Sequence, residues 1–176
     1  MPRPTLATVW LDGCSGCHMS LLDMDERLFE ITAKADIVYS PLIDVKEFPA
    51  HVDLCLVEGA VSSEEDLHKI KYVRERTSTL ISFGDCAVTA NVPGMRNPIG
   101  PQALLDRSYV ENVTLRPGIP VDVVPALLPV ATPIHRVVKV DVFLPGCPPS
   151  ADLIHQLLMD LIEGRTPDTH NARFGR

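Results

Sequence analysis

The chain has 176 residues, of which 45% are hydrophobic and 22% charged, and its formal net charge is −7 at pH 7. This composition predicts one globular domain over residues 1–176, with a loosely held tail from residue 164. The negative charge, without a block of Lys or Arg, argues against a nucleic-acid surface. No apolar run reaches the roughly 20 residues of a membrane helix, and the first residues do not resemble a signal peptide. We therefore expect a cytoplasmic protein that neither spans a membrane nor binds nucleic acid.

Strands and helices are expected to alternate along the chain. Apolar runs, most of them rich in β-branched residues, predict strands over residues 5–11, 37–39, 52–57, 79–83 and 137–144. Apolar residues at helical spacing predict helices over residues 19–34, 62–76 and 150–163. The second of these helices has a capping-box pattern, in which Ser62 or Ser63 precedes an acid by three residues.

A proline-rich stretch separates the fourth expected strand from the fifth. Eight of the 16 prolines lie between Pro93 and Pro133, which excludes a mostly regular helix or a central strand. We expect a long irregular excursion before the last strand, with one helix near residues 102–107. Loops of this length are usually functional or bound to another molecule.

Alternating strands and helices predict an α/β fold, a flavodoxin-like doubly wound parallel sheet with strand order 2-1-3-4-5. In such sheets, ligands collect outside the carboxyl ends of the strands, near the point where the strand order reverses. The loops after strands one, three, four and five should therefore meet at one edge of the sheet.

Four of the five cysteines lie in loops that follow expected strands, namely Cys14, Cys17, Cys86 and Cys147. Each has glycine or proline nearby, as expected for a tight turn rich in backbone groups. The topology therefore predicts that four thiols converge on one centre. Cys55 differs, because it alternates with leucines inside an apolar strand and is expected to be a small buried hydrophobic residue.

Several centres fit four cysteines in a reducing compartment, where a disulfide framework is not expected. A 4Fe-4S cluster takes one cysteine per iron and accepts ligands from distant loops. A structural zinc site also uses thiolates, but its ligands more often form two local pairs. Unligated or redox-active thiols are the third possibility. The spacing favours the cluster and leaves the other two open.

Two further residues lie beside the expected site. Glu58 closes a buried strand at the same edge, where its carboxylate would handle protons, accept a hydrogen bond or simply stabilise a loop. His18 adjoins Cys17, and either touches the edge of a cluster or a partner, or is solvated at the start of a helix. Asp12 and Asp85 are expected to be turn residues that bond nearby backbone.

The segments 10–17, 57–60, 84–87 and 145–149 together resemble the small subunits of NiFe hydrogenases, most closely the short type of bidirectional NAD-reducing enzymes. The resemblance extends over nearly the whole chain. It implies that Cys14, Cys17, Cys86 and Cys147 ligate the proximal 4Fe-4S cluster. The chain would then be an electron-transfer subunit of a hydrogen:NAD oxidoreductase, and it would not be catalytic alone.

The resemblance also implies partners and cofactors outside this chain. The large subunit would hold the NiFe centre, and a diaphorase module would carry further iron-sulfur clusters, FMN and the NAD site. FMN is not expected on this chain, because the loop after the first strand carries cysteines where a flavodoxin presents hydroxyl groups. The proline-rich region from Val92 to Pro133 and the loops around Cys17 and Glu58 would pack against the large subunit.

Two alternatives to the hydrogenase interpretation stay open. A cluster-bearing subunit of respiratory complex I shares this fold, but its first motif resembles an adjacent cysteine pair. Here Ser15 and Gly16 separate Cys14 from Cys17, which favours hydrogenase over a quinone-linked subunit. The other alternative is a zinc-stabilised binding module without a redox role.

Overall fold

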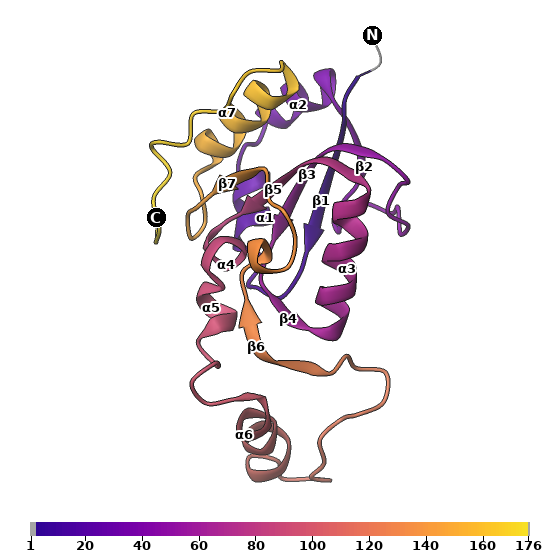
Figure 1. Cartoon of the computed structure of the whole chain (residues 1–176), viewed down its shortest axis with the longest axis vertical. Helices are drawn as coiled ribbons and strands as arrows, with labels where there is room; N and C mark the ends of the chain where they lie inside the picture. Colours follow the sequence, from indigo (N-terminus) through magenta and orange to yellow (C-terminus); the bar gives the residue numbers. More distant parts are fainter. Residues whose placement is uncertain (1–2, 176) are drawn as a thin grey trace.

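The computed structural model describes residues 3–175, and its centre is a five-stranded parallel sheet with the order β2-β1-β3-β5-β7 (Figure 1). Its strands are β1 (Thr5–Trp10), β2 (Asp36–Tyr39), β3 (Val52–Glu58), β5 (Thr77–Phe83) and β7 (Val142–Leu144). Counted in chain order within this sheet, these strands have the 2-1-3-4-5 order predicted from the sequence, and the α/β class is confirmed.

Helices cover both faces of the sheet (Figure 1). One face packs against α1 (Gly16–Leu22), α2 (Arg27–Lys34) and α7 (Ala151–Ile162). The other packs against α3 (Glu64–Glu75), α4 (Asp85–Thr89) and the short η2 turn (Ile134–Arg136). A hydrophobic core lies on each face of the sheet, and alternate residues of β3 point into the two cores. Leu54 and Leu56 belong to the first core, beside α1, α2 and α7, and Cys55 and Val57 belong to the second, beside α3 and α4.

One expected helix differs from the structure, and one crossover between strands lacks a helix. The helix predicted over residues 19–34 is two helices, α1 and α2, and Asp25 between them adopts a left-handed backbone with φ of 50°. Aspartate tolerates this conformation better than most residues, so the chain can turn there. The crossover from β2 to β3, residues 40–51, contains no helix, and Phe48 fills part of the second core in its place.

The last strand is shorter than the predicted 137–144, because only Val142–Leu144 pair with β5. Val137, Val138 and Val140 pack against the second core from an irregular segment that follows η2. Apolar residues that bury themselves from a loop give the same sequence pattern as a buried strand. The capping box is confirmed, and it joins Ser63 and Asp66 at the start of α3.

The proline-rich excursion contains one strand that the sequence did not reveal. β6 (Leu127–Thr132) pairs antiparallel with β4 (Val61–Ser63) in a separate two-stranded sheet. Between α5 (Asn91–Gly94) and β6, residues 95–126 form a protruding arm that carries α6 (Pro101–Asp106) and η1 (Arg107–Glu111) (Figure 1). No residue of this arm is buried. Across residues 3–175, no helix has the length and apolar character needed to cross a membrane.

Candidate functional site

The carboxyl ends of the strands bring the expected site residues together. Cys14 and Cys17 follow β1, Glu58 ends β3, Cys86 follows β5, and Cys147 follows β7. All five line one cavity of about 60 Å³. The other residues that line it are Gly16, Asp85, Gly146 and Pro148. The predicted convergence of the four thiols at one edge of the sheet is therefore confirmed. Cys55 is buried in the second core, as expected.

The four thiols differ in depth. Cys17 and Cys86 are each 6% exposed, whereas Cys14 and Cys147 are exposed at the surface. N-H donors lie near both exposed sulfurs: the Gly16 N-H lies 3.4 Å from Cys14 Sγ, and the Asn91 amide lies 3.6 Å from Cys147 Sγ. The cavity therefore has a buried inner wall and an outer wall that is exposed at the surface.

Glycine makes room for the sulfurs. Gly84 has φ of +82°, a conformation that L side chains rarely adopt, and a Cβ built on it would lie 2.1 Å from Cys17 Sγ. A Cβ on Gly16 would lie 3.2 Å from Cys14 Sγ. The glycine of the Gly84-Asp85-Cys86 turn is thus required both by the backbone torsion and by the space that the Cys17 sulfur occupies.

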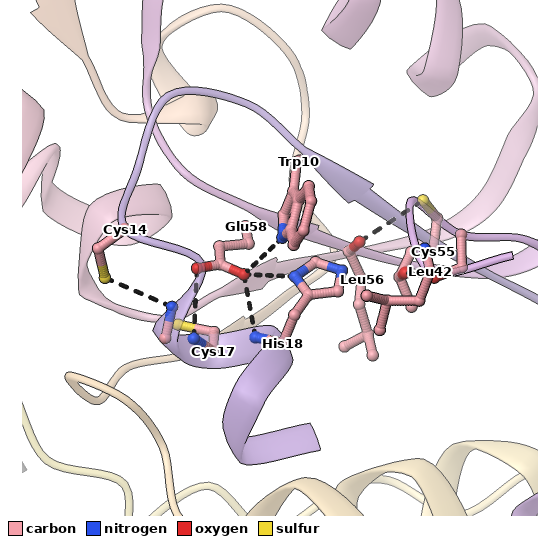
Figure 2. Close-up of polar contacts among 11 residues, drawn as sticks. Trp10, Cys14, Cys17, His18, Leu42, Cys55, Leu56 and Glu58 are labelled. Carbon is pink, nitrogen blue, oxygen red and sulfur yellow. Dashed lines mark hydrogen bonds and ion pairs between the residues drawn. The ribbon is translucent and has the colours of Figure 1, made fainter. Parts of the chain in front are cut away.

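A buried carboxylate organises the turn that carries Cys17 (Figure 2). Glu58 Oε1 accepts the Cys17 backbone N-H at 3.2 Å, and Oε2 accepts the His18 backbone N-H at 3.0 Å and the Trp10 indole N-H at 3.2 Å. The His18 ring also contacts Oε2 through Nδ1. Among the roles left open for Glu58, these contacts give it a hydrogen-bonding role in the loop.

The sequence gives little indication that His18 is buried. A solvated histidine at a helix start was one expectation, and it is wrong, because the residue is 1% exposed. Its ring lies against Trp10 and Phe83, with centroid distances of 5.1 and 6.0 Å. The only available signal was its position beside Cys17 in the Cys-x2-Cys turn.

The charges of the site affect one another. Burial opposes ionisation of Glu58, but the bonds from the His18 ring and from two backbone N-H groups outweigh it and lower the pKa of this carboxyl. Burial raises the pKa of the Cys17 thiol, and Glu58 and the other three cysteines raise it further. Burial also raises the pKa of Cys86, with Cys14 and Cys147 adding to the effect. Positive charge from a bound metal group would relieve this repulsion.

Asp12 and Asp85 make contacts that sequence reasoning did not foresee. The Asp12 carboxylate accepts the hydroxyl of Ser62, fifty residues away. Asp85 does accept backbone N-H groups, but they belong to distant segments: Gly146 at 2.6 Å and Gly175 at 2.7 Å. Both aspartates therefore join separate parts of the chain.

The donor set fits an iron-sulfur group better than a single ion. Four thiols from the three segments that follow β1, β5 and β7 surround a cavity, and a cubane takes one cysteine for each iron. A zinc ion instead needs its ligands to converge on one point, with sulfurs at about 2.3 Å. Within residues 3–175, no three His, Cys, Asp or Glu side chains are grouped in a way that would hold one metal ion.

The chain is similar to subunits of known oxidoreductases. Residues 14–161 match the family described as NADH ubiquinone oxidoreductase, 20 Kd subunit. The NAD-reducing hydrogenase HoxS subunit delta of Cupriavidus necator is 42% identical over 93% of this chain and 80% of its own length. A subunit of the F420-non-reducing hydrogenase vhu of Methanocaldococcus jannaschii is 39% identical over 90% of this chain, which spans only 56% of that relative.

Solved structures show the same fold. A chain of the NAD+-reducing [NiFe]-hydrogenase in the H2-reduced state superposes with a TM-score of 0.93 and 35% identity, covering 99% of this chain and all of that one. A chain of the [NiFeSe]-hydrogenase of Dm. baculatum gives a TM-score of 0.61 at 16% identity, with 93% of this chain and 63% of that one covered. This second likeness concerns the fold alone.

Proposed function

Because the chain belongs to the family of the NADH ubiquinone oxidoreductase 20 Kd subunit and is a small subunit of the NAD-reducing NiFe hydrogenase type, we propose that it transfers electrons through one 4Fe-4S cluster. The cluster is bound by Cys14, Cys17, Cys86 and Cys147. The observation that carries this proposal is that these four thiols, from the segments that follow three strands at one sheet edge, line a single cavity.

When bound, such a cluster takes up and releases single electrons at a potential set by its surroundings. The chain's own residues provide the position and the environment. Glu58 holds the turn of Cys17, Gly84 leaves space beside that sulfur, and Cys17 and Cys86 have little contact with bulk solvent. In the proposed enzyme, hydrogen is cleaved at a NiFe centre on another subunit.

The proposed assembly is cytoplasmic and contains a NiFe large subunit and a diaphorase module with further clusters, FMN and NAD. The exposed Cys14 and Cys147 mark the side of the cavity that a partner can approach. The arm, residues 95–126, supports a partner interface too, because it has no buried residue and exposes apolar side chains. The most exposed of these side chains are Met95, Ile99, Leu115, Val121 and Val123.

Metal analysis tests the cluster. The chain is purified anaerobically with its large subunit, and iron, zinc and acid-labile sulfide are measured on the same sample. About four irons and four sulfides per chain are expected. One zinc without sulfide would leave a zinc-stabilised binding module in place of an electron carrier. Replacing each of the four cysteines by serine should remove the cluster, whereas Cys55→Ala, outside the cavity, should retain it.

Limited proteolysis tests the partner interface. Arg107 is an exposed trypsin site in the arm. It should be cut in the chain alone and protected in the complex with the large subunit. Arg165 is exposed and follows the end of α7, a helix at the opposite end of the molecule from α6 of the arm (Figure 1), so it serves as an internal reference that is expected to stay accessible in the complex. Equal cutting of the arm in both samples would contradict the interface.

A further inference from the structure

Asp85 joins three segments of the chain at the wall of the cysteine cavity. It is 4% exposed and lines the cavity itself. Its Oδ1 accepts the Gly146 N-H at 2.6 Å, and its Oδ2 accepts the Gly175 N-H at 2.7 Å. Its own backbone N-H donates to the Gly146 carbonyl at 2.8 Å. The residue therefore connects the turn of Cys86, the turn of Cys147 and the carboxyl-terminal tail.

The Asp85 and Gly146 contacts fix two ligand loops relative to each other. Gly146 directly precedes Cys147, and Asp85 directly precedes Cys86. The Gly84 N-H also donates to Leu144 O at 2.8 Å, which extends the pairing of β5 and β7 up to the two turns. A reciprocal pair of hydrogen bonds leaves little freedom for either loop, so the separation of the Cys86 and Cys147 sulfurs depends on Asp85.

We propose that Asp85 is a positioning residue that holds the Cys86 and Cys147 loops and keeps the reduction potential of the proposed cluster low. The inference rests on the proposed function, since it needs a cluster in the cavity. A negative charge beside the cavity disfavours the added electron, and cluster potentials follow net charge, hydrogen bonds and solvent exposure. At 4% exposure, solvent and salt screen the charge of Asp85 weakly.

The decisive comparison is between Asp85→Asn and Asp44→Asn in the complex with the large subunit. Both substitutions remove one carboxylate, but Asp44 is exposed in the loop between β2 and β3 and does not line the cavity. Iron, sulfide and the midpoint potential are measured, the last by redox titration followed by electron paramagnetic resonance. D85N should raise the midpoint potential and change the shape of the signal of the reduced cluster. D44N should leave both as in the wild type.

The possible outcomes separate the inference from the proposed function. A wild-type complex without iron and sulfide would overturn the proposed function. Full iron and sulfide in all three proteins, with the same midpoint potential and the same signal, would overturn the role of Asp85 alone. If D85N does not assemble, Asp85→Ser is measured, because it removes the same charge without placing an amide N-H2 against a backbone N-H. It should raise the midpoint potential too, and an unchanged potential would again overturn the inference.

Discussion

Glu58 and His18 meet at one carboxylate oxygen, Oε2, which accepts the His18 backbone N-H at 3.0 Å and also contacts Nδ1 of the same residue's ring. Both residues are nearly inaccessible, at 2% and 1% exposure. The other oxygen of Glu58 accepts the N-H of Cys17. The end of β3 thus sets the orientation of the turn that carries an inner thiol of the site.

Glu58→Gln should weaken that turn. The amide oxygen of glutamine can replace one carboxylate oxygen, but its N-H2 group would face a backbone N-H donor at the other position. A buried donor left without a partner costs about 1–3 kcal/mol. We expect lower stability of that order and incomplete binding of iron and sulfide, measured by denaturant unfolding and metal analysis.

Glu26→Gln is the matched control for Glu58→Gln. Glu26 is exposed, and its side chain makes no capping bond at the start of α2. The control should behave as the wild type in both assays. Equal stability and equal iron content in E58Q and E26Q would show that the carboxylate does not anchor the Cys17 turn.

Gly84→Ala should abolish cluster binding. The new methyl group would lie 2.1 Å from Cys17 Sγ, a distance at which the sulfur must move. Gly100→Ala separates this clash from backbone strain, because the two glycines have similar torsions: φ 82° and ψ 165° against φ 86° and ψ 156°. A Cβ on Gly100 meets nothing within 4 Å.

Both alanine variants should lose about 1–3 kcal/mol of stability to strain. Only G84A should lose iron and sulfide and the visible absorption of the cluster. If G84A binds as much iron as G100A, the space beside Cys17 is not limiting, and the close approach of Gly84 to this sulfur has no bearing on the cluster.

The sheet and the four cysteines were predictable from the sequence for a simple reason. Long apolar runs show the strands, and parallel strands place their carboxyl ends at one edge, so loops far apart in sequence must meet. Cys86 and Cys147 are separated by 61 residues, yet both follow neighbouring strands, β5 and β7. Their convergence needed only the strand order.

The contacts that hold the site in place could not be predicted in this way. The burial of His18 in α1 depends on Trp10 of β1 and Phe83 of β5. The bond from Gly175 to Asp85 spans 90 residues and leaves no periodic signal. β4 has three residues, too few for an alternating pattern to show, so its pairing with β6 was hidden inside the proline-rich excursion.

Asp141 should stabilise the fold at neutral pH and lose this effect in acid. Burial opposes its ionisation, but the Leu80 N-H at 2.9 Å, with Arg74 and Lys139, outweighs that effect and lowers the pKa of Asp141 from its usual 3.8. The folded state therefore favours the carboxylate. Its contribution is present above about pH 3.8 and disappears as the pH falls through the lower folded-state pKa.

Asp141→Asn should therefore lower the free energy of unfolding most at neutral pH, by about 1–3 kcal/mol. The difference from the wild type should shrink steadily below pH 3.8. Denaturant unfolding of the purified chain at a series of pH values measures this, with exposed Asp44→Asn as the control. A difference that is independent of pH would mean that the charge of Asp141 does not provide the stabilisation.

Asn97 should anchor the start of the arm to β6. Its side chain pairs with the backbone of Ala131 in β6, donating from Nδ2 to the carbonyl at 2.9 Å and accepting the N-H on Oδ1 at 2.8 Å. Ala131 is 2% exposed, so Asn97→Ala would leave a buried N-H without a partner. Faster tryptic cutting at Arg107 is therefore expected in the isolated chain. Gln102→Ala, which removes only an exposed bond to Asp106, should leave the cutting rate unchanged.

Asn97→Ala also tests whether the arm and the cysteine site are structurally independent. Because Asn97 attaches the arm to β6 and not to the cysteine loops, N97A should keep its iron and sulfide while its affinity for the large subunit falls. Metal analysis and a binding titration with the large subunit measure the two properties on one preparation. Loss of the cluster in N97A would instead show that the arm and the cysteine cavity are structurally coupled.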